Sequence, residues 1–199
     1  PVHDGIPGMA VMYEGHYAVV PYVIPGKYVC YAFSYTGGAL VQWCADQLGK
    51  EEKRQAQANR VSVYDFLEAA GKSPTGLLVL PHFAGGATPY MDNGSKGAIL
   101  GLTLSHTVHD IYRACMEGVA YEMLLNKEYL NRSGIYFDQL HATGGGAKSK
   151  VWMQMKADIL NLPMKVLKTS DAGTVGSAMM TGVALGLYED IKEAGEEMI

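Results

Sequence analysis

The sequence predicts an α/β fold in which helices pack on strands, with parallel neighbouring strands in the last third of the chain. Three observations support this. The last third alternates strand-like and helix-like segments around a glycine turn, the middle holds one long amphipathic helix, and the first third has runs rich in β-branched and aromatic residues. Alternating strands and helices are typical of parallel strands joined by helical crossovers. The 199 residues suffice for one sizeable domain or two small ones.

The first third predicts a hairpin followed by a helix. Residues 17–24 and 28–35 are separated by Pro25-Gly26, which is a turn signal. Pro21 cannot donate a backbone hydrogen bond and therefore favours an edge strand. After residues 36–38 the apolar spacing becomes that of a helix. Its predicted inward face consists of Leu40, Val41, Cys44 and Leu48.

A charged stretch and a short helix come next. Residues 50–60 are rich in charge and predict a solvated connection. Ser62 and Asp65 stand three residues apart, as in a capping box, and predict a short helix that Gly71 ends. The residues expected to face inward from it are Val63, Phe66, Leu67 and Ala70.

The middle of the chain predicts a strand, a long loop and the longest helix. Residues 77–80 form a short apolar strand, and residues 82–97 show no periodicity, which is typical of a functional loop. The helix should span residues 107–130, with Asp110, Arg113 and Glu117 able to pair on the side opposite its apolar stripe. Gly118 in its interior costs about 1 kcal/mol relative to alanine. We therefore expect close packing against a neighbour at this glycine.

The last third predicts strand, turn, helix, strand and helix. The strands are residues 140–143 and 164–167, and the helix between them covers residues 149–161. A final helix over residues 174–187 is rich in small residues. Four of these, Gly176, Ala178, Gly182 and Ala184, mark either a contact in a homo-oligomer or tight packing inside the chain.

Composition argues against several classes of function. A formal net charge of −4 without a block of like charge disfavours a nucleic-acid binder. No apolar run approaches the roughly 20 residues that span a bilayer, so no membrane partner is expected. The three cysteines form no CxxC pair and indicate buried thiols in a reducing cytoplasm. The histidines lack metal-ligand spacing, and no metal-binding residues are predicted.

The glycine turn at residues 144–146 is the most chemical feature of the sequence. Backbone N–H groups at the start of a helix carry partial positive charge, and missing side chains allow a phosphate to approach. The segment is neither a P-loop nor a G-x-G-x-x-G motif, because Ala147 and Ser149 stand where glycines would be required. Spacing alone leaves two interpretations open, a phosphate site and a plain tight turn.

Two segments, one at this turn and one upstream of it, resemble signatures of the FGGY family of carbohydrate kinases. Residues 143–149, with 152–154 and 157–163, are similar to the family's adenosine motif, GGGA-x-S followed by a tryptophan-bearing helix and an AD-x-L-x-x-P exit. Residues 97–118 resemble the second family signature. Cys115 departs from the small residues preferred there, but it is similar in size.

Two further segments agree in order and spacing. Residues 78–92 are similar to the family's loop between a strand and a P-y-w-D sequence, with Met91 in the usual place of tryptophan. Residues 37–43 look like the helix start of glycerol and xylulose kinases. The resemblance covers about residues 28–188, and four matches in order are more specific than any one of them.

The resemblance implies a ribonuclease H-like domain of the actin and hexokinase type, a mixed sheet flanked by helices. Residues 1–199 would form a single C-terminal nucleotide-binding domain. The implied nucleotide-binding residues lie on two helix starts: Gly38, Gln42, Gly144, Gly145, Gly146 and Ser149. The amides of Gly145 and Gly146 would face the phosphates, and Ser149 would lie at the adenine or ribose edge.

The same resemblance implies an enzyme that transfers the γ-phosphate of ATP, with Mg²⁺, to a hydroxyl of a sugar or polyol. Its expected partners are an N-terminal kinase domain and that small molecule. The family's DxGT phosphate loop is not found, and neither Asp4 nor Asp92 matches the context of the family's base, so no catalytic residue is predicted. We expect the chain alone to be inactive.

Other classes of function stay open from the sequence. One is a non-catalytic binding or assembly module that keeps the actin-like fold. Another is a dinucleotide binder built on residues 144–149, but this would need an acid at the end of the next strand, where residues 167–169 read Leu-Lys-Thr. The GGGAKS form slightly favours pentulose over glycerol kinases.

Overall fold

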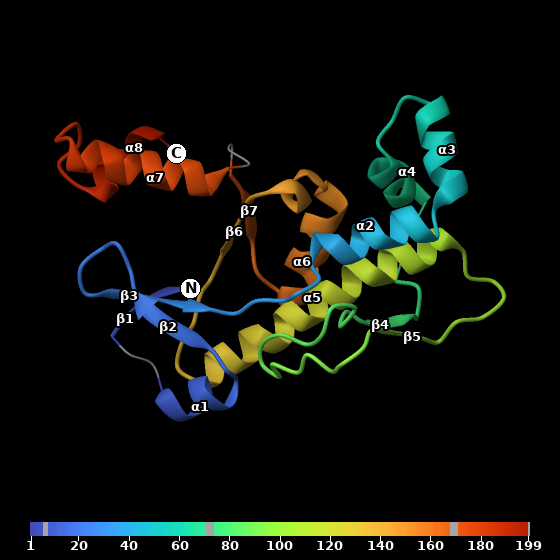
Figure 1. Ribbon diagram of the computed structural model, residues 1–199, viewed down its shortest axis with the longest axis horizontal. Coiled ribbons are helices and arrows are strands. Elements are labelled where there is room, and N and C mark those ends of the chain that lie inside the picture. The colour runs from blue at the N-terminus through green and yellow to red at the C-terminus, as the bar shows by residue number, and fades with distance from the viewer. Residues whose placement is uncertain (6–7, 71–73, 168–170, 199) are drawn as a thin grey trace.

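One long helix organises the fold. The computed structural model describes residues 1–5, 8–70, 74–167 and 171–198, and α5 (Val108–Arg132) runs through its middle (Figure 1). The other helices are α1 (Met9–Glu14), α2 (Gly38–Gln47), α3 (Lys50–Ala58), α4 (Val63–Ala70), α6 (Lys150–Leu160), α7 (Ala172–Ala184) and α8 (Ile191–Met198). The strands are β1 (Val2–Asp4), β2 (Ala18–Pro21), β3 (Lys27–Tyr31), β4 (Leu78–Leu80), β5 (Ala98–Leu100), β6 (Leu140–Ala142) and β7 (Met164–Val166).

The strands form both antiparallel and parallel pairs, as expected of a mixed architecture. Within the described ranges they divide into three small sheets, ordered β1-β3-β2, β4-β5 and β6-β7. The predicted hairpin is confirmed, because β2 and β3 pair antiparallel with Val19 opposite Cys30. Pro21 lies on β2 at the edge of its sheet, where its missing N–H matters least. The predicted parallel pair is β6 and β7.

The main core forms around α5. Apolar side chains of α2, α4, β4 and α6 pack on it in one buried cluster. A capping box of Thr107 and Asp110 begins α5, with the Thr107 N–H donating to Asp110 Oδ2 at 2.7 Å. The expected close packing at Gly118 is confirmed, since a Cβ there would lie 2.5 Å from the Val79 carbonyl oxygen. This glycine therefore lets β4 lie directly against the helix.

Several local predictions were wrong. Residues 50–60 are largely the helix α3, in which Glu51 accepts from Arg54 Nη2 at 2.5 Å and from Gln55 at 2.8 Å. Such pairs one turn apart support an exposed helix face, and Ala56 is the buried residue of this helix. Leu48 is exposed because α2 ends at Gln47, before the predicted apolar face is complete. The predicted stop at Gly71 lies outside the described residues, as does the side chain of Ala70.

The small-residue segment near the C-terminus forms α7, and the following helix α8 was not predicted. A Cβ at Gly182 would lie 2.7 Å from the ring of Tyr188, so packing inside the chain accounts for this glycine. A Cβ at Gly176 would meet nothing within 4 Å. Among the helices that the structure describes, none has the length and apolar character to cross a bilayer.

Candidate functional site

A single 3₁₀ turn connects the glycines to α6, which begins close to residue 149, where the sequence predicts the helix to start. Gly144 adopts a left-handed φ of 83°, and Gly145–Lys148 form a single 3₁₀ turn. Ser149 then acts as the N-cap of α6, where its Oγ accepts a hydrogen bond from the Trp152 N–H at 2.9 Å. Since Oγ caps α6, Ser149 has a structural role in addition to any contact with a ligand.

The two sides of the turn differ in packing. A Cβ at Gly144 or Gly145 would meet nothing within 4 Å, so this part of the turn borders open space. A Cβ at Gly146 would lie 3.1 Å from the indole of Trp152. Trp152 in turn donates from Nε1 to the Met116 carbonyl at 3.1 Å, which ties the turn to α5. The turn is therefore anchored at Gly146 and open at Gly145.

A cavity of about 820 Å³ opens beside the turn, between α4, α5 and the start of α6. Lys148 and Ser149, which directly follow the glycines, line it. The other polar residues that line it include charges of both signs and one neutral amide: Asp65, Glu68, Arg113, Lys150, Asp158 and Gln154. Sequence reasoning did not assign a binding role to any of these residues, because they come from three segments that meet only in the folded chain.

Burial perturbs the ionisation of two groups near the turn. The pKa of Glu68 is raised by burial, and the neighbouring Ser149 hydroxyl partly opposes this by hydrogen bonding to the carboxylate. Burial lowers the pKa of Lys156, whose Nζ lies 4.0 Å from the centroid of the Trp152 ring. Glu68 lines the cavity, whereas Lys156 contacts the Trp152 ring and does not line it.

Gly38 and Gln42 lie on α2 and do not line this cavity. Gly38 is the first residue of α2, and a Cβ there would meet nothing within 4 Å. Gln42 is exposed and hydrogen-bonds the carboxylate of Asp46 one turn further on. The structure therefore provides a second open, glycine-led helix start, resting through Leu40 on the same core as Trp152.

Neither aspartate that the sequence analysis set aside occupies a catalytic environment. Asp4 is largely exposed and forms an ion pair with Lys27 at 2.5 Å. Asp92 is exposed and accepts the Gly94 N–H at 2.8 Å, as in a turn. Over the described part of the chain, no group of three or more histidine, cysteine, aspartate or glutamate side chains could hold a metal ion.

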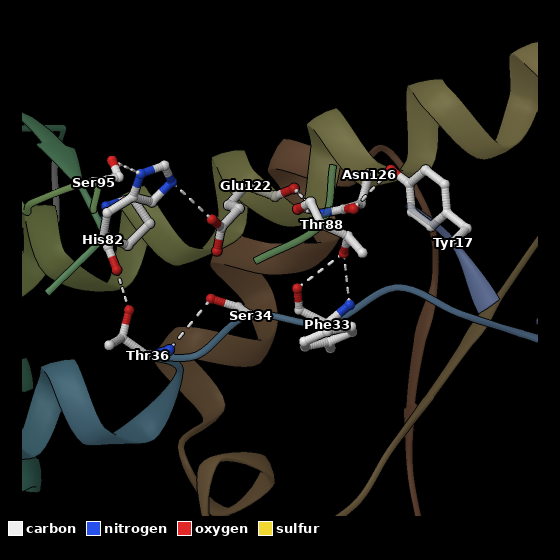
Figure 2. Close-up of polar contacts among 10 residues, drawn as sticks. Tyr17, Phe33, Ser34, Thr36, His82, Thr88, Ser95, Glu122 and Asn126 are labelled. Atoms are coloured by element: carbon white, nitrogen blue, oxygen red, sulfur yellow. Dashed lines mark hydrogen bonds and ion pairs between the residues drawn. The ribbon is translucent and has the colours of Figure 1, made fainter. Parts of the chain in front are cut away.

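A buried polar network on α5 was missed from the sequence (Figure 2). His82 lies between Ser95 and Glu122, with Nδ1 2.7 Å from Ser95 Oγ and Nε2 3.2 Å from Glu122 Oε1. Asn126, one turn along α5, donates to the Thr88 carbonyl at 3.1 Å. The side-chain oxygen Oδ1 of Asn126 accepts a hydrogen bond from the Tyr17 hydroxyl at 2.8 Å. These contacts join the loop of residues 82–97 to α5.

The same network reaches the segment before α2. Thr88 Oγ1 accepts the Phe33 N–H at 2.8 Å and lies 2.9 Å from the Phe33 carbonyl, while Thr36 donates to the carbonyl of Pro81. The spacing of Val119, Glu122 and Asn126 on α5 was the available signal. They continue the apolar stripe, so a polar residue at the last two positions must be buried and needs partners.

The arrangement is that of a ribonuclease H-like domain of the actin and hexokinase type, the fold of the solved kinases that it matches. The family model described as the C-terminal domain of the FGGY family of carbohydrate kinases matches residues 10–185. The chain belongs to this family.

Similar proteins of known name are sugar and polyol kinases. A xylulose kinase of Staphylococcus epidermidis is 28% identical over 94% of this chain and 36% of its own length. A glycerol kinase of Pseudothermotoga lettingae is 32% identical over 90% of this chain and 36% of its own. The crystal structure of ligand-bound xylulose kinase from Lactobacillus acidophilus matches 98% of this chain and 38% of its own with a TM-score of 0.74 and 26% identity. The chain thus spans about a third of these relatives.

Proposed function

We propose that this chain is the ATP-binding part of a kinase that transfers the γ-phosphate of ATP to a hydroxyl of a sugar or polyol. The observation that carries the proposal is the glycine turn, which is open at Gly144 and Gly145 and lies beside a cavity of about 820 Å³. The relatives named above are xylulose and glycerol kinases, which are enzymes of this class.

The residues present fit a nucleotide. First-turn N–H groups of a helix have no acceptor within that helix. Gly145 and Gly146 are the first residues of the 3₁₀ turn and carry no side chain of their own to shield their amides. Phosphoryl transfer depends mainly on positioning and on neutralising charge, and backbone amides provide both. Ser149 and the cavity beyond it would take the adenosine, and Gly38 and Gln42 would line the nucleotide from α2. ATP supplies the transferable phosphoryl group.

The proposal assigns the chemistry to a longer protein. An N-terminal domain would provide the sugar site, the second phosphate loop and the base, and Mg²⁺ would bind with ATP between the two halves. The chain alone is then inactive. A cytoplasmic location agrees with three cysteines that are free and buried.

Nucleotide titration followed by NMR tests the site directly. We expect ATP with Mg²⁺ to shift the amide signals of residues 144–149, whereas NAD should leave them unchanged. Gly145→Val should lower the affinity for ATP obtained from this titration at least tenfold, because the valine side chain would fill the open space where the phosphates would lie. Gly176→Val is the matched control, since it adds the same side chain to an equally open glycine on α7.

The result can go against the proposal in two ways. Amides of residues 144–149 that stay unchanged at millimolar ATP would favour the non-catalytic assembly module. Sugar-dependent ATP consumption by the purified 199-residue chain would show that a second domain is not needed.

A further inference from the structure

One buried carboxylate stands in the wall of the cavity beside the glycine turn. Glu68, on α4, lines this cavity and has only 9% of its surface exposed. The other charged residues of the wall are exposed or of intermediate burial: Asp65, Arg113, Lys148, Lys150 and Asp158. Taking a carboxylate out of water costs free energy unless hydrogen bonds replace the water. Glu68 is therefore placed to accept hydrogen bonds from a ligand in the cavity.

Ser149, which lines the same cavity, is largely occupied by contacts within the chain. Its Oγ accepts the Trp152 N–H at 2.9 Å as the N-cap of α6, and its hydroxyl hydrogen-bonds the carboxylate of Glu68. A serine hydroxyl has only one hydrogen to donate, whereas a carboxylate accepts up to about four hydrogen bonds. Of these two side chains, Glu68 thus keeps the larger capacity to bind a ligand.

The order of groups in a nucleotide indicates which of them reaches Glu68. The phosphates are proposed to lie at the amides of Gly145 and Gly146, and in any nucleotide the ribose links the phosphates to the base. A 3₁₀ turn rises about 2 Å per residue, so Ser149 follows Gly146 at a distance of about 6 Å along the turn. The polar groups directly beyond the turn should therefore meet the ribose before the base.

The hydroxyls of a ribose suit a carboxylate. The 2′ and 3′ hydroxyls are two neighbouring donors, and an ionised carboxylate has two acceptor oxygens and no donor. Hydrogen bonds to a charged acceptor are stronger than those between neutral groups. In dinucleotide-binding folds an acidic side chain binds the ribose in this way. The edges of the bases mix donors and acceptors, so a carboxylate matches them only in part.

The charges of the cavity wall favour the same orientation of the nucleotide. Lys148 ends the 3₁₀ turn that Gly145 begins, so a cation follows the amides that would hold the phosphates. Glu68 comes from α4, which forms a different wall. Like charges repel, so a nucleotide with its phosphates at the turn and its ribose at α4 avoids repulsion between phosphate and Glu68.

We propose that Glu68 binds the ribose of the nucleotide by accepting hydrogen bonds from its 2′ and 3′ hydroxyls, and that Ser149 positions the carboxylate. This role rests on the proposed function, because it concerns the same cavity. Glu68 lies outside the segments that resemble signatures of the family, which are residues 37–43, 78–92, 97–118 and 143–163. With this residue α4 becomes a wall of the nucleotide site.

Three nucleotides separate the ribose contact from the other contacts. ATP, 2′,3′-dideoxy-ATP and GTP, each with Mg²⁺, are titrated into the chain at pH 8, and the amide signals of residues 144–149 give the three dissociation constants. The dideoxy nucleotide lacks only the two hydroxyls. Its affinity should be at least about tenfold lower than that of ATP, because the carboxylate then loses its hydrogen-bond donors.

Two variants assign this difference to the carboxylate. Glu68→Met removes the acceptor oxygens but keeps a side chain of similar length, and should bring the affinities for ATP and dideoxy-ATP to within about twofold of each other. Glu68→Gln keeps one acceptor oxygen and should give an intermediate ratio. The ratio of the affinities for ATP and GTP should equal that of the parent in both variants.

Asp65→Asn is the matched control. It removes one negative charge from the same helix and the same cavity, but at an exposed position. It should change the affinities for ATP and dideoxy-ATP by the same factor.

Four results would overturn the ribose contact. Equal binding of ATP and dideoxy-ATP by the parent does so and leaves the proposed function intact. A Glu68→Met variant that keeps the parent's preference for ATP over dideoxy-ATP does the same. A change in the ratio of ATP to GTP affinity in that variant would show that the carboxylate meets the base instead. If none of the three nucleotides binds, the proposed function fails as well.

Discussion

Two polar regions lie along α5, and they differ in how their polar atoms are satisfied. In the network of Tyr17, Thr88, His82, Glu122 and Asn126, polar atoms mostly bind one another and little surface is exposed. In the cavity beside Ser149, side chains of both signs line open space. A network that satisfies itself holds chain segments together, whereas polar groups around an open cavity are available to a ligand. We therefore expect the first region to stabilise the fold and propose that the second binds a ligand.

The largest effect should come from breaking the closed network. Asn126→Ala removes hydrogen bonds to Tyr17, Thr88 and the Glu122 carbonyl. It should lower the free energy of unfolding by about 3 kcal/mol, measured by chemical denaturation. The counterpart in the cavity is Gln154→Ala, which removes an exposed hydrogen bond to Asp158. It should change the free energy of unfolding by less than about 0.5 kcal/mol. Similar losses in both variants would contradict the comparison.

A second contrast uses two glycines. Gly118→Ala places a methyl group 2.5 Å from the Val79 carbonyl oxygen and should destabilise the fold by about 1–3 kcal/mol, since β4 and α5 must move apart. Gly145→Ala adds the same group to open space and should leave the thermal midpoint within about 1 °C. A stable Gly118→Ala variant would show that the packing at β4 is loose.

The smallest effect should appear in the pH dependence. The pKa of Glu68 is raised above its ordinary value of 4.5 by burial beside the cavity. Between 4.5 and the raised value the folded chain binds more protons than the unfolded chain, so stability falls as pH rises through this range. Glu68→Gln should therefore match the parent at pH 4 and be the more stable of the two at pH 8, in thermal unfolding at each pH.

Glu51 is the control of opposite sign. Arg54 and Gln55 lower its pKa to about 2 by hydrogen bonding to the carboxylate. Its contribution is present above 4.5 and is lost as pH falls towards 2, so Glu51→Gln should remove stability at neutral pH. If both variants changed stability in the same direction, burial would not be the cause of the Glu68 shift.

Local patterns predicted the elements that depend on neighbouring residues. The hairpin around Pro25-Gly26, the start of α5 near residue 107 and the parallel strands on either side of the glycine turn all follow from signals within a few residues. The charged helix α3 was missed because its side-chain pairs lie on an exposed face and a single small residue, Ala56, is buried. A search for apolar periodicity does not detect such a helix.

In the candidate site, too, some features could be predicted from the sequence and others could not. The glycines at residues 144–146 were recognisable, since their type and order suffice to indicate a turn without side chains. The walls of the cavity were not, because Glu68, Arg113 and Asp158 come from three helices. The role of Ser149 as the N-cap of α6 was not predictable either, because it depends on the 3₁₀ turn that precedes this residue.

By itself the sequence determined the family, the hairpin, the long helix and the strands around the glycine turn, and the need for a close neighbour at Gly118. These rest on residue type and short spacing, which the chain carries before it folds. Only the tertiary structure decided that Glu122 and His82 meet, that Gly145 is open while Gly146 is packed, and that α4 forms a wall of the cavity. Contacts between distant segments depend on how helices pack in three dimensions, and no local pattern encodes that geometry.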